Sequence, residues 1–223
     1  HFMLKEIMEE PEALRRAAAP RIQSGRIVLD GVSLTAADFR SYNKIAIIAC
    51  GSSYHVGMVG KYNLEKLLRI PVEVTLASEF RYSDPIVDER TLAVVISQSG
   101  ETLDTMAALR EAKSRGARIL SIVNVVGSSV VRESDDVLYT WAGPEIAVAT
   151  TKAYSTQLMV LTMLGLYLSQ VRGTLDEAEY LRLVAALERV PDQLETVLAS
   201  REEIQYYASQ YFNHDSVFFI GRN

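Results

Sequence analysis

The sequence contains little that could bind a metal ion or form a disulfide. It has one cysteine, Cys50, and three histidines, His1, His55 and His214, among 223 residues. A single cysteine excludes an internal disulfide framework and a cysteine-rich zinc site. Three histidines spread along the chain are too few for a histidine-based metal cluster. We therefore expect no metal site.

The motifs of common cofactor sites are missing as well. No G-x-G-x-x-G sequence follows a strand-like apolar run, which weakens a dinucleotide-binding interpretation. Gly60-Lys61 is followed by Tyr62 and position 55 is not glycine, so there is no Walker A loop. The G-x-S-x-G, H-E-x-x-H and C-x-x-C patterns are also absent. We predict that the chain uses no cofactor.

Long apolar runs and an excess of positive charge are not found either. The longest apolar stretch, Leu158–Leu168, has 11 residues, whereas crossing a bilayer takes about 20 residues. We interpret this stretch as a buried helix. Lys and Arg total 23 against 28 Asp and Glu, a formal net charge of −5. That balance argues against nucleic acid or a membrane surface as the main partner.

The N-terminus does not resemble a targeting signal. His1–Glu6 carries an acidic residue early and lacks the apolar core of a signal peptide. We therefore expect a cytoplasmic protein. Because the first residue is not Met, we also expect the chain to be a piece of a longer polypeptide.

Short apolar runs alternate with helical stretches through the middle of the sequence. Each run is bounded by Gly, Ser or other turn-forming residues, as is typical of strands that helices bury on both faces. The predicted strands are Ile45–Cys50, Val72–Leu76, Leu92–Ile96, Arg118–Val123 and Asp136–Thr140. Helices of this length between strands favour right-handed crossovers. The pattern predicts an α/β fold with a doubly wound, mainly five-stranded parallel sheet flanked by helices.

The segments on either side of this alternating region are expected to have other structures. Residues 1–43 are expected to form a helical linker or N-terminal segment, 44–171 the α/β subdomain, and 172–215 a helical connector. Thr174–Glu177 matches a capping box that would begin a helix. Ser216–Ile220 reads as a buried strand before a glycine turn, so 216–223 is predicted to start a second, truncated subdomain.

Three loops rich in hydroxyl groups follow predicted strands or precede predicted helices. They are Gly51–Ser53, Ser97–Thr102 and Ala149–Lys152. Ligands of open α/β sheets bind at the carboxyl ends of the strands, against the N-termini of helices. Any one loop could equally be a helix cap, since Ser and Thr are common caps. Three such loops at one sheet edge favour a site for a phosphate with few formal positive charges, which suits a sugar phosphate.

Several segments, in order, resemble the sugar isomerase (SIS) family, and within it the isomerase half of the glutamine–fructose-6-phosphate aminotransferases, also called glucosamine-6-phosphate synthases. The matching segments are His1–Pro11, Cys50–Tyr54, Ser78–Tyr82, Ser97–Thr102 and Val148–Ala153. The resemblance covers essentially the whole chain. It implies the SIS fold, a flavodoxin-like three-layer sandwich, with 44–171 as the first SIS subdomain and 216–223 as the start of a truncated second one.

The resemblance also implies which residues bind a sugar phosphate such as fructose 6-phosphate or glucosamine 6-phosphate. The phosphate-binding positions are Ser97, Gln98, Ser99 and Thr102, with Ser53 nearby. The positions that contact the sugar are Ser52, the backbone around Val148, and Thr150. Ser52 stands where Thr is frequent and Thr150 where Ser is frequent, so both positions keep a hydroxyl.

No catalytic residue is predicted within this chain. By the resemblance, the family's catalytic groups lie in a glutaminase domain and a second SIS subdomain that are missing here. Isomerisation needs a base that moves a proton between adjacent carbons; His55 and His214 lack a plausible partner, and Glu101 is expected to stabilise the N-terminus of the helix that follows it. The family is dimeric, so a homodimer is expected. A related sugar-phosphate deglycase or isomerase and a sugar-phosphate sensor remain alternatives.

Overall fold

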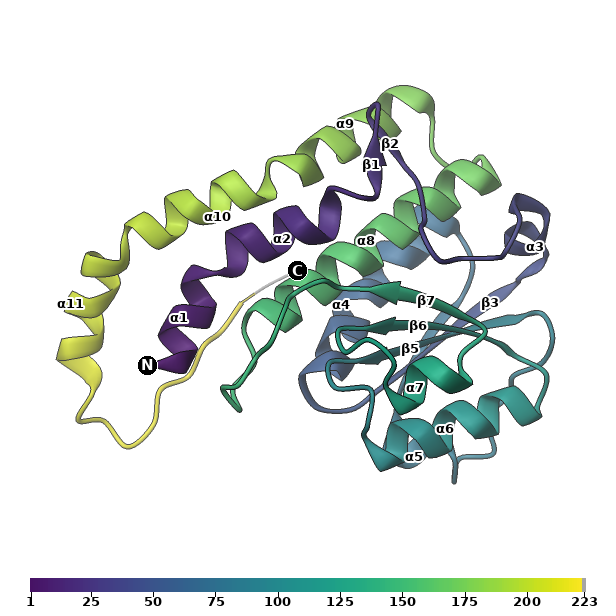
Figure 1. Ribbon diagram of the computed structural model, residues 1–223, viewed down its shortest axis with the longest axis horizontal. Helices are drawn as coiled ribbons and strands as arrows, with labels where there is room; N and C mark the ends of the chain where they lie inside the picture. Colours follow the sequence, from purple (N-terminus) through teal and green to yellow (C-terminus); the bar gives the residue numbers. More distant parts are fainter. Residues whose placement is uncertain (222–223) are drawn as a thin grey trace.

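A five-stranded parallel sheet forms the centre of the molecule (Figure 1). The computed structural model describes residues 1–221. The strands are β3 (Lys44–Ala49), β4 (Val72–Leu76), β5 (Thr91–Ser97), β6 (Arg118–Val123) and β7 (Asp136–Tyr139). Their order across the sheet is β4-β3-β5-β6-β7, and all neighbours run parallel. This is the flavodoxin-like order, in which the chain direction across the sheet reverses between β3 and β5. The predicted doubly wound sheet is confirmed.

The structure also contains helices, some of which cover the two faces of the sheet. They are α1 (Phe2–Met8), α2 (Glu10–Ala18), α3 (Ala36–Ser41), α4 (Gly51–Leu68), α5 (Ala77–Phe80), α6 (Leu103–Ser114), α7 (Ser129–Glu133), α8 (Lys152–Arg172), α9 (Glu177–Glu188), α10 (Val190–Ala199) and α11 (Arg201–Tyr211). Helices α4 and α8 pack on one face, and α5, α6 and α7 on the other (Figure 1). Helices α2 and α9 pack on the outer side of α8, and α10 packs on α2 (Figure 1).

The strands are apolar on both sides because both sides are covered. Successive residues of a strand point to opposite faces. Ile47 of β3 therefore packs towards α4 and α8, and Ile48 towards α5 and α6. All but the first residue of β3 are buried, as is every residue of β5. The two-sided burial explains why these strands read as continuous apolar runs rather than as alternating ones.

Helix α8 contains the apolar stretch Leu158–Leu168, and the predicted buried helix is confirmed. It crosses α4 at two glycines, Gly60 of α4 and Gly165 of α8. A Cβ on Gly60 would collide with Leu161, and a Cβ on Gly165 would lie 2.7 Å from a methyl carbon of Leu64. The missing side chains let the two helices approach closely. No helix within residues 1–221 is long and apolar enough to span a membrane.

The predicted strand Ser216–Ile220 is not formed. This segment is irregular and exposed, with Ile220 97% accessible. A strand needs a neighbour for its backbone N–H and C=O groups, and no described strand pairs with this one. Arg222 and Asn223, which end the predicted second subdomain, lie outside the described residues.

The capping box predicted at Thr174 is also wrong. The N-cap of α9 is Asp176, whose carboxylate accepts a hydrogen bond from the Glu179 amide. The Thr174 hydroxyl instead donates to the Leu67 carbonyl at 2.6 Å and so binds the chain to the end of α4. Three short features were not predicted: α3, α5 and the hairpin of β1 (Ile22–Gln23) with β2 (Arg26–Ile27).

Candidate functional site

A cavity of about 330 Å³ opens where the strand order reverses, beyond the carboxyl ends of β3 and β5. The N-terminal ends of α4, α6 and α8 surround it. All the sequence-predicted binding residues line this one cavity: Ser52, Ser53, Ser97, Gln98, Ser99, Thr102, Val148 and Thr150. The three loops that were predicted to meet at one sheet edge therefore do so.

The loop after β5 is held in shape by its own serines. The Ser97 hydroxyl oxygen is buried and accepts a hydrogen bond from the Gly100 amide at 2.9 Å. The Ser99 hydroxyl oxygen accepts one from the Glu101 amide at 3.2 Å. Gly100 has φ +66°, a left-handed conformation that glycine adopts without steric cost. The loop is thus preshaped before any ligand enters.

Two helix N-termini face the cavity without a side-chain cap. Cys50 precedes α4 and Thr102 precedes α6, and neither side chain makes a capping hydrogen bond. The first amides of a helix have no partner inside the helix, and the helix dipole makes this end positive. The ends of α4 and α6 are therefore suited to an anion.

The N-terminus of α8 is already occupied by a carboxylate. Glu145 accepts hydrogen bonds from the Thr150 hydroxyl at 2.8 Å, the Thr151 amide at 2.9 Å and the Ala153 amide at 3.2 Å. Glu145 also lines the cavity. An anion is consequently favoured at the α4 and α6 side, and neutral hydroxyl groups at the Glu145 side.

Among residues 1–221, no positively charged residue lines the cavity. Lys152, in the third hydroxyl-rich loop, is only 3% exposed, and its ammonium contacts the Glu9 carboxylate at 2.6 Å. The hydrogen bond from Lys152 lowers the pKa of Glu9. Because this lysine is paired with the N-terminal segment, the groups that the cavity offers to an anion are amides and hydroxyls.

Acidic residues of the N-terminal helices hold the loop that carries Val148. Glu6, which is buried, accepts hydrogen bonds from the amides of Ile146 at 2.7 Å and Ala147 at 3.3 Å. Glu10 accepts one from the Ser155 hydroxyl of α8. Together with the Glu9–Lys152 pair, these contacts fix the 144–152 segment against α1 and α2.

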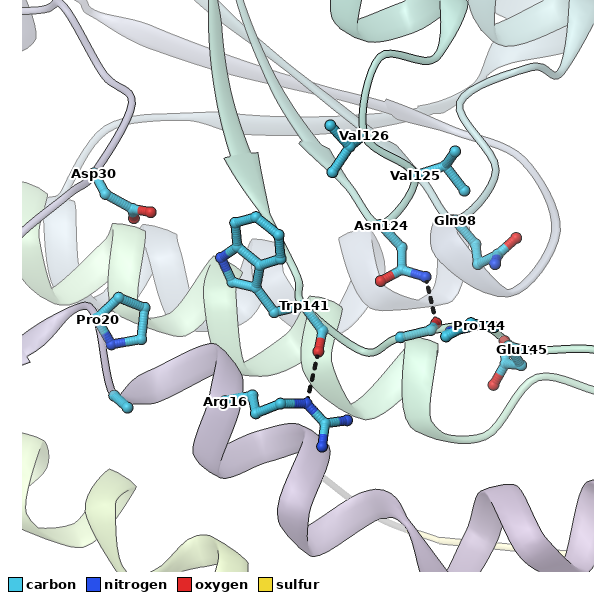
Figure 2. A pocket seen from close by; sticks show the side chains of 12 residues that line it. Arg16, Pro20, Asp30, Gln98, Asn124, Val125, Val126, Trp141, Pro144 and Glu145 are labelled. Carbon is cyan, nitrogen blue, oxygen red and sulfur yellow. Dashed lines mark hydrogen bonds between the residues drawn. The ribbon is translucent and has the colours of Figure 1, made fainter.

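A larger cavity of about 1000 Å³ lies beside the first (Figure 2). Its wall is mostly apolar and includes the Trp141 ring. Gln98 and Glu145 line both cavities and form the boundary between them. Arg16 of α2 donates from Nε to the Trp141 carbonyl at 3.3 Å, so the N-terminal segment closes this side too (Figure 2).

Residues 38–167 match the SIS domain family. The chain belongs to this family. It is 54% identical over 223 residues to the glutamine–fructose-6-phosphate aminotransferase (isomerizing) of Clostridium acetobutylicum, and 55% identical over 225 residues to that of Symbiobacterium thermophilum. Both alignments cover 100% of this chain and 37% of the relative.

A solved structure shows the same similarity. The C-terminal domain of glucosamine-fructose-6-phosphate aminotransferase from Francisella tularensis superimposes with a TM-score of 0.90 at 38% identity. The superposition covers 96% of this chain and 60% of that one. The predicted SIS fold and the resemblance to the aminotransferases are confirmed, and the chain spans well under half the length of its curated relatives.

The sequence analysis missed several residues that line this SIS cavity, among them the polar residues Thr105, Glu145 and Gln157. Gln157 is 2% exposed in α8, and its side-chain oxygen accepts a hydrogen bond from the Ser53 hydroxyl at 3.0 Å. A polar amide among the apolar residues of α8 was the available signal for Gln157. For Glu145, the signal was an acidic residue shortly before a helix start.

The candidate acid–base residues of the sequence analysis do not line the SIS cavity. His55 and His214 pack edge-on or tilted against Tyr54 and Tyr211. Glu101 accepts a hydrogen bond from the Ser129 amide at 2.8 Å; it therefore stabilises the start of α7, and not that of α6 as predicted. No cluster of His, Cys, Asp and Glu within residues 1–221 could hold a metal ion.

Proposed function

We propose that this SIS domain binds the phosphate of fructose 6-phosphate or glucosamine 6-phosphate, as part of an isomerizing glutamine–fructose-6-phosphate aminotransferase. The observation that carries the proposal is the convergence of Ser97, Gln98, Ser99 and Thr102 with the uncapped ends of α4 and α6 in one cavity. The similarity to such aminotransferases along the entire chain supports it.

The proposal also specifies how the sugar phosphate is oriented in the cavity. The phosphate lies against the loop 97–102, where amides and hydroxyls donate. Among residues 1–221, the carboxylate that lines the cavity is that of Glu145, which already accepts hydrogen bonds at the start of α8. The sugar hydroxyls lie towards Ser52, the backbone at Val148, and Thr150. A volume of about 330 Å³ falls within the range of small-ligand pockets.

The intact enzyme, in this proposal, transfers the amide nitrogen of glutamine to fructose 6-phosphate, and this chain alone catalyses nothing. Proton transfer between adjacent carbons requires a base within hydrogen-bond reach of the proton. Within the described part of the chain, Glu145 is the only carboxylate that lines the cavity, and its oxygens already accept hydrogen bonds from Thr150, Thr151 and Ala153. The base, the ring-opening acid and the glutaminase domain would be supplied by other parts of the polypeptide.

We also propose a cytoplasmic homodimer. The chain carries exposed apolar residues beyond α10, among them Tyr207, Phe218 and Ile220, and large exposed apolar surfaces mark sites of association. The net charge of −5 remains unsuited to nucleic acid or an anionic membrane.

Titration of the chain with fructose 6-phosphate, followed by NMR amide shifts, tests the binding proposal. Ser99→Ala and Thr102→Ala should each raise the dissociation constant about tenfold or more, because a hydrogen bond to a charged group contributes about 1.5–3 kcal/mol. Ser114→Ala is the matched control, since Ser114 lies at the other end of α6 and its hydroxyl donates to the Glu111 carbonyl. If both site variants bind as the wild type does, the phosphate binds elsewhere.

A further inference from the structure

Gln157 has a hydrogen-bonding arrangement that the fold alone does not require. Its side chain is 2% exposed, lines the cavity, and accepts a hydrogen bond from the Ser53 hydroxyl at 3.0 Å through Oε1. Its amide nitrogen, which has two N–H donors, makes no hydrogen bond to any described residue. The nitrogen is not one of the fully buried side-chain atoms that lack a partner, so its two donors are open to the cavity and can respond to a ligand there.

The same contact turns Ser53 away from an anion. A serine hydroxyl has one proton, and here Ser53 donates it to Gln157. Only oxygen lone pairs are then left for the cavity. A phosphate oxygen is itself an acceptor and repels them, so in this arrangement the Ser53 hydroxyl cannot donate to a phosphate, although it lies at the uncapped end of α4.

We propose that Gln157 is a positioning residue that sets the direction of the Ser53 proton, an inference that rests on the sugar-phosphate function proposed above. When phosphate binds, the Gln157 amide turns by half a rotation, so that its NH₂ group donates to the Ser53 oxygen. Ser53 then donates its proton to the phosphate. The last torsion of a glutamine is broad and permits this turn without movement of the backbone.

The two hydrogen bonds of the bound state reinforce each other. Donation from Gln157 polarises the Ser53 hydroxyl and makes it a stronger donor to the anion. The turn also places the amide oxygen where the nitrogen had been, at the cavity wall, where a sugar hydroxyl can donate to it. A neutral amide is suited to this task because it offers both a donor and an acceptor on one planar group.

A double-mutant cycle separates this role from simple core packing. Gln157→Met keeps the volume and removes both the donor and the acceptor. The probes are inorganic phosphate and fructose 6-phosphate. We expect Ser53→Ala to weaken binding about tenfold or more and Gln157→Met about threefold to tenfold. With inorganic phosphate as the probe, which has no sugar hydroxyl, Gln157→Met in the Ser53→Ala background should change the dissociation constant by less than about twofold, because residues that act through one contact are not additive. Thr156→Val, a buried change on the adjacent residue of α8 whose hydroxyl donates to the Lys152 carbonyl, should leave the affinity unchanged.

A second measurement does not depend on the variants being folded. The side-chain ¹⁵NH₂ signals of wild-type Gln157 should shift when phosphate is added and reach their end point with the same dissociation constant as the amides of the 97–102 loop. Multiplicative effects of Ser53→Ala and Gln157→Met, or unshifted NH₂ signals in a protein that binds phosphate, would overturn the inference and leave the proposed function standing. Failure of the wild type to bind either probe would overturn both.

Discussion

Replacing Gly100 by alanine tests how the loop between β5 and α6 is built. Gly100 adopts φ +66°, and a left-handed conformation costs a residue with a Cβ about 1–2 kcal/mol. The new Cβ would also lie 2.7 Å from the Cβ of Ser128 and collide with its hydroxyl. Forced overpacking costs a further 1–3 kcal/mol or so. Gly100→Ala should therefore lower the free energy of unfolding by about 2–5 kcal/mol, measured by urea denaturation.

A second substitution separates the two contributions. Ser128→Gly removes the obstructing side chain, whose buried hydroxyl has no hydrogen-bond partner among the described residues. Combined with Gly100→Ala, it should restore the part lost to the collision, about 1–3 kcal/mol, and leave the conformational part. Gly100→Ala should also weaken phosphate binding at this loop, and the double variant should recover phosphate affinity in parallel with stability. If Gly100→Ala unfolds at the wild-type urea midpoint, or if Ser128→Gly brings no recovery, the account of this loop is wrong.

Further expectations concern charge and assembly. Arg21 is fully buried, and its guanidinium contacts the Asp30 carboxylate at 2.6 Å and donates to the Ala17 carbonyl. Asp30 is 41% exposed and is hydrated once the arginine is removed, so Arg21→Met should destabilise the fold by about 1–3 kcal/mol through the lost hydrogen bonds. Arg26→Met, at the exposed ion pair with Glu177, should change stability by less than about 1 kcal/mol; thermal unfolding measures both. Burial raises the pKa of Glu10 above its ordinary 4.5, and the nearby Glu145 adds to the rise. The folded state then holds this proton more tightly than the unfolded state does, so stability falls as the pH rises from 4.5 through the raised value. Glu10→Gln should gain stability relative to wild type across that pH window. A stability difference between the two proteins that stays constant from pH 4 to pH 7 would contradict this expectation. Light scattering should show self-association at high concentration, and a clean monomer would count against the proposed dimer.

The sheet was readable from the sequence because each central strand is apolar on both faces. The limits of β4 and β6 match the expected ones to the residue. The weak points are segments whose structure depends on a partner. Ser216–Ile220 has the composition of a buried strand, but composition cannot supply the neighbouring strand it needs. Short elements such as α3 are too brief for their periodicity to be recognised.

The sequence analysis predicted those residues of the candidate site that a local sequence pattern indicates. It missed the residues whose role depends on tertiary contacts. The hydroxyl groups of the 97–102 loop follow a strand and precede a helix, a pattern visible in the sequence. Gln157 gains its role only because α8 packs beside α4 and brings it to Ser53. Likewise, nothing near Glu6 in the sequence indicates that it accepts hydrogen bonds from Ile146 and Ala147.

The contacts of Glu6, Glu9 and Glu10 determine at which residue a shortened recombinant protein should begin. The family match begins at residue 38, and a shortened chain starting there would keep every strand of the five-stranded sheet. It would nevertheless leave two amides of the 144–152 segment and the Lys152 ammonium without their acceptors. It would also uncover the side of α8 on which α2 packs. Boundaries for crystallisation, screening or domain exchange therefore belong before α1, although the sheet itself begins some forty residues later.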